Sequence, residues 1–238
     1  MIEVSAFKWV PPFAQGVVRD LRVRWALEEA GYGYDDRLLG FEDCASSAYR
    51  AWQPFGQVPA FRDDRVEMFE SGAIVLYIAQ KSDQLMPYDE AGRAMVMTWL
   101  FAALNSVEPY VTDLATIDLF HAGEAWTAER RPQVEDALRR RLGDLQTALG
   151  DRQWFAGEQF SAADILMATV LRGLRHTAIL ADYPALEACG ALHRAAGVPA
   201  GAGGTDGAVQ GQRAGLIRQT TRVQPRGRRT SMGRKRPL

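Results

Sequence analysis

Every segment with a strand-like pattern lies in the first 69 residues of this 238-residue chain. Alternating or β-branched runs predict strands, and runs with helical spacing between them predict helices. The expected strands and helices follow the order strand, helix, strand, helix, strand, strand, helix, at residues 2–7, 17–30, 34–39, 44–53, 58–64, 65–69 and 71–82. This order is typical of a small α/β domain with a mixed sheet.

The chain beyond residue 82 carries only helical patterns. A long helical pattern covers 92–120, and we expect a kink or break near Pro109 because a proline inside a helix removes a backbone hydrogen bond. A second pattern at 131–149 places one apolar stripe opposite charged residues, formed by Val134, Leu138, Leu142, Leu145 and Leu149. A third helix follows Phe160, with Ser161 as N-cap and Asp164 at the third helical position.

These patterns predict an α/β domain at 1–82, a linker at 83–90 and an all-helical domain at 91–195. The composition is that of a soluble globular protein, with 47% hydrophobic and 24% charged residues. No apolar run is long enough to span a bilayer, and the N-terminus does not have the pattern of a signal peptide. Two cysteines without a CxxC pair fit a reducing compartment, and three scattered histidines offer no metal-ligand spacing. We therefore expect a cytoplasmic protein with no metal and no membrane partner.

Three motifs in order carry a resemblance to a known family: GQVPAF at 56–61, ESGAIVLYIA at 70–79 and FSAADILMATV at 160–170. With the predicted architecture, the chain from residue 2 to 192 resembles the cytosolic glutathione transferases of bacterial type. The resemblance implies a thioredoxin-like first domain and a helical second domain. It also implies a homodimer and glutathione as co-substrate.

The resemblance assigns the glutathione-binding residues to two of these motifs. It implies that the Val58–Pro59 bond is cis, so that the Val58 backbone can pair with the cysteinyl part of glutathione. Ser71 can donate to the γ-glutamyl carboxylate, Glu70 can accept from its ammonium, and Gln57 can add a polar contact. Two alternatives need no ligand: Pro59 can end an edge strand, and Ser71 can be an ordinary helix cap.

The residue that activates the thiol is not evident. Members of the family usually place a Tyr, Ser or Cys soon after the first strand, but residues 6–31 contain none of these or Thr. Trp9 and Gln15 are weak candidates to replace it, and Lys8 or the free N–H groups of the first helix are others. The expected function is conjugation of the glutathione thiolate to a small hydrophobic electrophile. The alternative is a non-catalytic member that binds glutathione or a protein partner.

The resemblance places the electrophile between the first loop and the first long helix of the second domain. Aromatic and polar residues there are candidates to line its site, although aromatic residues at helical spacing more often belong to a core than to a pocket. The candidates are Trp9, Phe13, Trp99, Phe101, Asn105 and Tyr110.

The last 43 residues, 196–238, differ in composition from the rest of the chain. They contain eight arginines, one lysine and one aspartate, a net charge of +8, which leaves −9 on residues 1–195. The segment is rich in glycine and has no apolar period, where the family has further packed helices. We interpret it as a disordered basic tail, for which a shifted reading frame is one explanation. The alternative is a nucleic-acid-binding arm, which we do not favour, so no nucleic-acid partner is expected.

Overall fold

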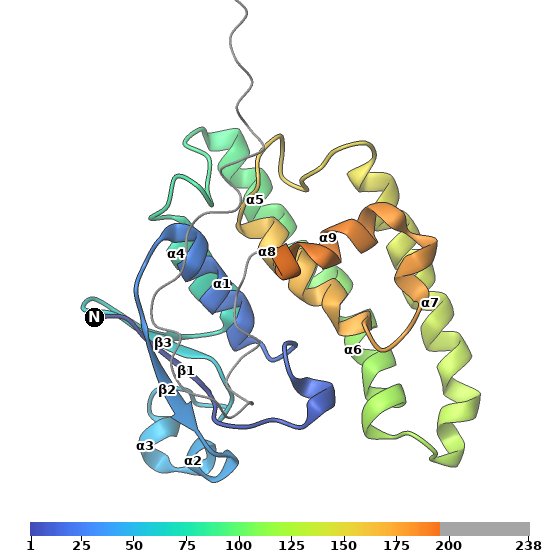
Figure 1. The fold of residues 1–238 in the computed structure, drawn as a ribbon, viewed down its shortest axis with the longest axis horizontal. Coiled ribbons are helices and arrows are strands. Elements are labelled where there is room, and N and C mark those ends of the chain that lie inside the picture. The colour runs from blue at the N-terminus through green and yellow to red at the C-terminus, as the bar shows by residue number, and fades with distance from the viewer. Residues whose placement is uncertain (196–238) are drawn as a thin grey trace, which may run out of the picture.

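A computed structural model describes residues 1–195. The tail predicted at 196–238 lies outside the described residues. The structure confirms the predicted architecture, because a small mixed sheet with helices on both faces is followed by a bundle of helices (Figure 1).

The sheet has four strands in the order β2-β1-β3-β4. These are β1 (Glu3–Phe7), β2 (Asp35–Leu39), β3 (Ala60–Arg62) and β4 (Glu67–Phe69). The first two strands are parallel, because helix α1 (Asp20–Ala30) crosses over between them, whereas β3 pairs antiparallel with both β1 and β4. The predicted hairpin is present but shorter than expected, since β3 begins only after Pro59, which has no N–H to donate.

Two of the predicted helices of the α/β part differ from expectation. Helix α1 starts at Asp20 rather than at residue 17, and the Gly16 carbonyl accepts from the Arg172 side chain of the helical part instead of from a helical N–H. The predicted helix at 44–53 is two short helices, α2 (Phe41–Ala45) and α3 (Ser47–Arg50), separated at Ser46, whose hydroxyl caps the second. Both differences arise from hydrogen bonds, those of the Gly16 carbonyl and the Ser46 hydroxyl, which the spacing of apolar residues does not predict.

Helices cover the two faces of the sheet unequally. α1 and α4 (Ser71–Ala79) pack together on the face that meets the helical part, while α2 and α3 lie on the other face (Figure 1). Under α2 and α3 a small separate core includes Cys44, Tyr49, Trp52 and Val58. The main core is continuous from β1 through α1 and α4 into the helical part, so the two parts share one apolar interior.

The helical part contains α5 (Glu90–Ala102), α6 (Glu108–Ala115), α7 (Ala125–Leu149), α8 (Ala162–Leu171) and α9 (Pro184–Ala195). α5 and α6 are joined by a π-helical turn at Ala103–Val107, and a second such turn extends α6 through Thr116–Phe120. Helical turns therefore run past Pro109 without the expected break, but the α-helical pattern itself is interrupted by the π-helical turn directly before this proline. Pro109 lies in the first turn of α6, where its missing N–H costs least.

Helix α8 is the centre of this part, with every residue buried and contacts to α5, α9 and α1. Its start is the predicted capping box: the Ser161 N–H donates to Asp164 Oδ2 at 2.9 Å, and the Ser161 hydroxyl also pairs with that oxygen. The predicted apolar stripe of α7 is buried at all five positions. Among the described helices none is both long and apolar enough to cross a membrane.

A cavity between the sheet and the helical part

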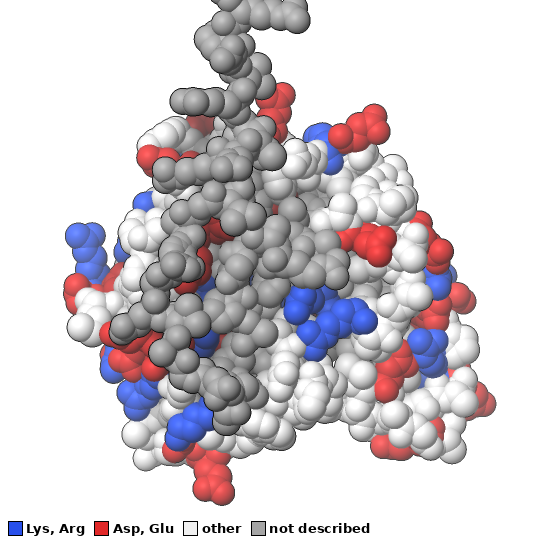
Figure 2. Space-filling view, viewed as in Figure 1, with Lys and Arg blue, Asp and Glu red and all other residues white. Residues whose placement is uncertain are grey.

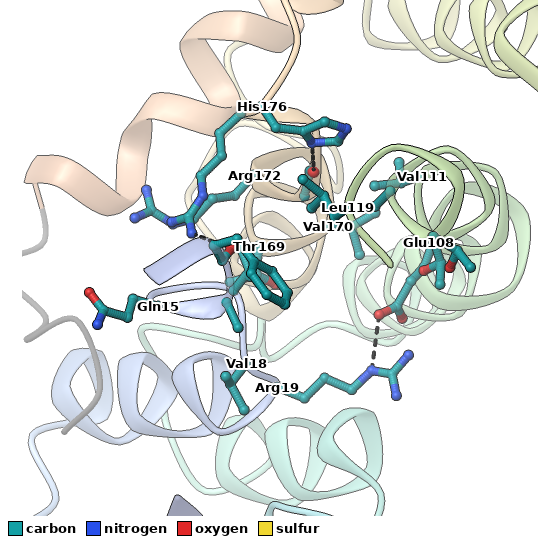
Figure 3. A pocket seen from close by; sticks show the side chains of 18 of the residues that line it. Gln15, Val18, Arg19, Glu108, Val111, Leu119, Thr169, Val170, Arg172 and His176 are labelled. Atoms are coloured by element: carbon teal, nitrogen blue, oxygen red, sulfur yellow. Dashed lines mark hydrogen bonds and ion pairs between the residues drawn. The ribbon is translucent and has the colours of Figure 1, made fainter. Parts of the chain in front are cut away.

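A cavity of about 850 Å³ lies where the α/β part meets the helical part. Five segments line it: the end of β1 at Phe7, the loop at 12–19 with the start of α1, the turn at 56–58, one face of α6 and its extension, and the end of α8 with the residues that follow it (Figure 3). Six residues of the α6 wall recur every three or four positions: Glu108, Val111, Thr112, Ala115, Thr116 and Leu119, after which Phe120 ends the wall. That spacing places all six on one face of the helix.

At one end of the cavity, Arg22 joins three elements. Its side chain is only 4% exposed, and Nη2 lies 3.0 Å from Glu108 Oε1 of α6. Nη1 lies 3.3 Å from the Ser71 hydroxyl at the start of α4. Arg19 donates to the same carboxylate oxygen at 3.1 Å, as Figure 3 shows. Burial by itself raises the pKa of Glu108, but the Arg22 and Arg19 guanidiniums outweigh burial and hold that pKa below its ordinary value.

The structure places the predicted glutathione-contacting residues around this end without bringing all of them to the cavity. Gln57 and Val58 line it, and the Val58–Pro59 bond is cis. Ser71 is buried and reaches the lining only through Arg22. Glu70 is exposed, and its φ of 71° lies in the left-handed region that non-glycine residues rarely adopt. Such backbone strain, on the order of 1–3 kcal/mol, is concentrated at functional sites.

A buried hydroxyl network holds the turn that carries Gln57 and Val58. Ser5 Oγ accepts from the Ala60 N–H at 2.6 Å and lies 2.7 Å from the Tyr49 hydroxyl. Tyr49 in turn donates to the Gln57 carbonyl at 2.6 Å. Ser5 thus has a structural position inside β1, and it is not among the residues that line the cavity. No sequence pattern reveals this network, because Ser5 is 44 residues from Tyr49 and 55 residues from Ala60.

The candidates for thiol activation are separated by the fold. Trp9 is 56% exposed and Lys8 pairs with Asp43 at the surface, and neither lines the cavity. Gln15 does line it, although Figure 3 shows its amide turned away from Glu108 and Val111. Sequence reasoning missed the basic residues of the cavity. Four guanidiniums line it, those of Arg19, Arg22, Arg172 and Arg175, together with a single carboxylate, that of Glu108. Only Arg22 lies in an α-helix, α1, whereas Arg19 precedes α1 and Arg172 and Arg175 follow α8. They form no sequence motif, so only the packing of these segments could reveal them.

Most candidates for the electrophile site lie elsewhere. Of the six, only Phe13 lines the cavity. Trp99 packs against Phe155 in the core, and Tyr110 lies against the Arg141 guanidinium on another side of α6. Trp9, Phe101 and Asn105 are exposed outside the cavity. For the four candidates in helical segments, helix orientation decides the outcome: Tyr110, for example, is two residues from Glu108, a rotation of about 200° around the axis.

The two cysteines do not supply the missing activator. Cys44 and Cys189 are both buried and unpaired, and burial raises the pKa of each thiol. Neither lines the cavity. Within residues 1–195, no cluster of three or more His, Cys, Asp or Glu side chains is arranged to hold a metal ion.

Comparisons with known proteins agree with this architecture. Residues 14–80 match the family described as glutathione S-transferase, N-terminal domain, and residues 96–189 match its C-terminal domain. The probable glutathione S-transferase GSTF2 of Oryza sativa subsp. japonica is 30% identical over 68% of this chain and 80% of that protein. The disulfide-bond oxidoreductase YghU of Escherichia coli K12 is 30% identical over 65% of this chain, which spans only 55% of YghU.

A solved structure is similar over most of both chains. The glutathione transferase of Burkholderia graminis, with two glutathione molecules bound per subunit, has a TM-score of 0.70 and 25% identity. The match covers 84% of this chain and 85% of that one.

Proposed function

This chain belongs to the glutathione S-transferase family, and from that premise we propose that it binds glutathione and conjugates its thiolate to a small hydrophobic electrophile. The observation that carries the proposal is the cavity itself. It opens between the α/β part and the helical part, has Gln57 and Val58 on one wall, and has on the other the α6 wall, where Val111, Ala115 and Leu119 are apolar.

Glutathione is proposed to occupy the end of the cavity near Arg22. The Val58 backbone pairs with the cysteinyl unit, and Gln57 adds a polar contact. Ser71 and Glu70, at the N-terminus of α4, bind the γ-glutamyl carboxylate and ammonium. The buried Arg22 supports this placement, because its hydrogen bond fixes the Ser71 hydroxyl and its charge favours a carboxylate nearby.

The proposed chemical step is nucleophilic substitution or addition by the glutathione sulfur. The thiol proton passes to solvent, the sulfur forms a bond to the electrophilic carbon, and with an aryl chloride the chloride leaves with the bonding pair. No hydroxyl or thiol occurs in the loop at 8–19 to stabilise the thiolate. We assign that role to the start of α1, which follows directly on the cavity-lining turn of Val17, Val18 and Arg19, together with the guanidiniums that line the cavity. Free N–H groups at a helix start and nearby cations both lower a thiol pKa.

A second candidate is reduction of disulfides by glutathione. It is favoured by the named activity of YghU and by the absence of a hydroxyl or thiol from the first loop. One glutathione thiolate attacks a substrate disulfide and releases a thiolate, and a second glutathione attacks the mixed disulfide to give oxidised glutathione and the other thiol. The non-catalytic alternative requires only that the protein binds glutathione, with no chemical step.

The experiment combines a titration with two assays. The ultraviolet absorbance of the thiolate is followed against pH in the complex, and turnover is measured with 1-chloro-2,4-dinitrobenzene and with hydroxyethyl disulfide. We expect the bound thiol to ionise about one pH unit or more below the ordinary value near 8.5, with turnover of the aryl chloride. Ser71→Ala should weaken glutathione binding about tenfold in calorimetry.

Each outcome separates the candidates. Disulfide reduction without aryl transfer overturns conjugation in favour of the second candidate. Binding with an unshifted pKa and neither activity supports the non-catalytic alternative. If the Ser71→Ala variant binds glutathione as tightly as the parent, glutathione does not bind at the start of α4.

We further propose a homodimer, a cytoplasmic location and the domain boundaries expected from the sequence. Two exposed aromatic residues support the dimer: Phe55 is 61% exposed with its ring edge against Phe69, and Phe101 is 53% exposed. The free cysteines support a reducing compartment. Sedimentation that finds only a monomer at micromolar concentration contradicts the dimer.

A further inference from the structure

We propose that the electrophile carries an anionic group, such as a carboxylate, and that Arg175 selects for it. This inference rests on the proposed conjugation and names the class of second substrate. It follows from the difference between the two ends of the cavity.

The cavity is longer than glutathione needs. Glu108 begins the α6 wall and Phe120 ends it, twelve residues later, which corresponds to about 18 Å along a helix. A fully extended α-linked tripeptide spans at most about 11 Å, and the γ-glutamyl link of glutathione adds only about two carbon–carbon bonds to that length. With glutathione at the Gln57 and Arg22 end, the Phe120 end remains for the second substrate.

The two ends of the cavity differ in whether a carboxylate pairs with the arginines there. At the Glu108 end, one carboxylate pairs with Arg19 and Arg22. At the other end, Arg175 Nη2 donates to the Phe13 carbonyl at 2.8 Å, and none of the described carboxylates forms an ion pair with it. A carbonyl oxygen accepts one hydrogen bond but leaves the charge uncompensated, and a guanidinium has five N–H donors. Figure 2 shows basic side chains gathered over the C-terminal end of α8, whereas acidic and basic side chains are mixed over α7.

The surroundings of Arg175 define the rest of the substrate. Its partner Phe13 meets Phe120 edge to face at 5.2 Å between ring centroids, which joins the first loop to the extension of α6. Leu119 and Val170 complete an apolar wall. An aromatic or alkyl body fits this wall, and a carboxylate at its far end can form a bidentate pair with the guanidinium. A neutral electrophile leaves that charge without a partner.

The test compares 4-chloro-3,5-dinitrobenzoate with its methyl ester, which have the same reacting carbon and differ in charge. The ratio of kcat/KM for the acid to that for the ester is measured in the parent, Arg175→Gln and Arg175→Lys. We expect the ratio to fall about tenfold in Arg175→Gln, the usual loss for one charge-assisted hydrogen bond at a partly exposed site, and to be largely kept in Arg175→Lys. Glutamine retains an N–H for the Phe13 carbonyl, and comparing ratios cancels the different intrinsic reactivity of the two substrates.

Arg140→Gln is the matched control, because Arg140 is an exposed arginine of α7 outside this cavity. A ratio that is unchanged in Arg175→Gln, or that falls equally in Arg140→Gln, overturns the proposal.

The S-aryl glutathione conjugates of the acid and the ester are also titrated by calorimetry, so the inference is tested even if neither substrate turns over. Absent turnover contradicts conjugation alone. Selective binding of the acid conjugate, lost in Arg175→Gln, supports the anionic site independently, and equal binding of the two conjugates by the parent overturns it.

Discussion

Two carboxylates at helix starts, the buried Asp164 and the partly buried Glu108, are held in opposite ways. Asp164 at the start of α8 accepts from the N–H groups of Phe155 and Ser161, which are nine and three residues away in the sequence. Glu108 at the start of α6 is held by Arg22, which is 86 residues away and also contacts Ser71 of a third element. Neutral dipoles of the same segment stabilise the first, and cations from another part of the fold stabilise the second.

The difference appears in the acidity of the two groups. Burial raises the pKa of Asp164, because neutral donors do not fully replace the lost hydration. Burial acts on Glu108 as well, but two guanidiniums reverse its effect and lower the pKa. A local cap therefore organises a helix start, whereas the Arg22 cluster ties α1, α4 and α6 together beside the cavity.

The largest effect is expected from Asp164→Ala. The substitution leaves the Phe155 and Ser161 N–H groups buried without an acceptor, and we expect the free energy of unfolding to fall by about 4 kcal/mol. Ser161→Ala removes only the cap hydroxyl and should cost about 1 kcal/mol. Urea denaturation measures both. If the two variants lose equal stability, the role assigned to the Phe155 N–H is wrong.

A smaller loss, about 3 kcal/mol, is expected from Arg22→Met, because Glu108 is then left partly buried with only the half-exposed Arg19. The double variant Arg22→Met/Glu108→Leu should recover more than half of this loss, since it removes the unpaired charge as well. Urea denaturation of the four proteins in this cycle gives the coupling energy. Additive losses in the double variant would show that the two residues are not coupled, in contradiction to the observed ion pair.

The smallest effect is a difference in pH dependence. A lowered pKa means that the stability Glu108 contributes is complete above the ordinary value of 4.5 and is lost as pH falls through the folded value. A raised pKa means that the contribution of Asp164 is greatest below its ordinary value of 3.8 and declines as pH rises through the folded value.

Stability measured from pH 7 down to 3.5 checks this contrast. The margin of the parent over Glu108→Gln should shrink with acid, and its margin over Asp164→Asn should grow. Margins that change in the same direction would contradict the assigned causes.

The same contrast explains what was predictable about the electrophile site. Phe13 follows two prolines in a loop, and it reached the cavity as expected. The positions in and around α6 failed, because the sequence gives the period of a helix but not its rotation toward a neighbour. Arg172 and Arg175 had no signal at all, since their partners are the Gly16 and Phe13 carbonyls, 156 and 162 residues away.

The sequence by itself determined the order of strands and helices, the capping box of α8 and the buried stripe of α7. Each depends on residues within a few positions of one another, where backbone geometry fixes which side chains meet. Only the tertiary structure decided where α1 begins, that helical turns run past Pro109, and which basic groups line the cavity. Those outcomes depend on contacts between segments far apart in the chain, where hydrogen bonds and ion pairs form only after the two parts have packed on a common core.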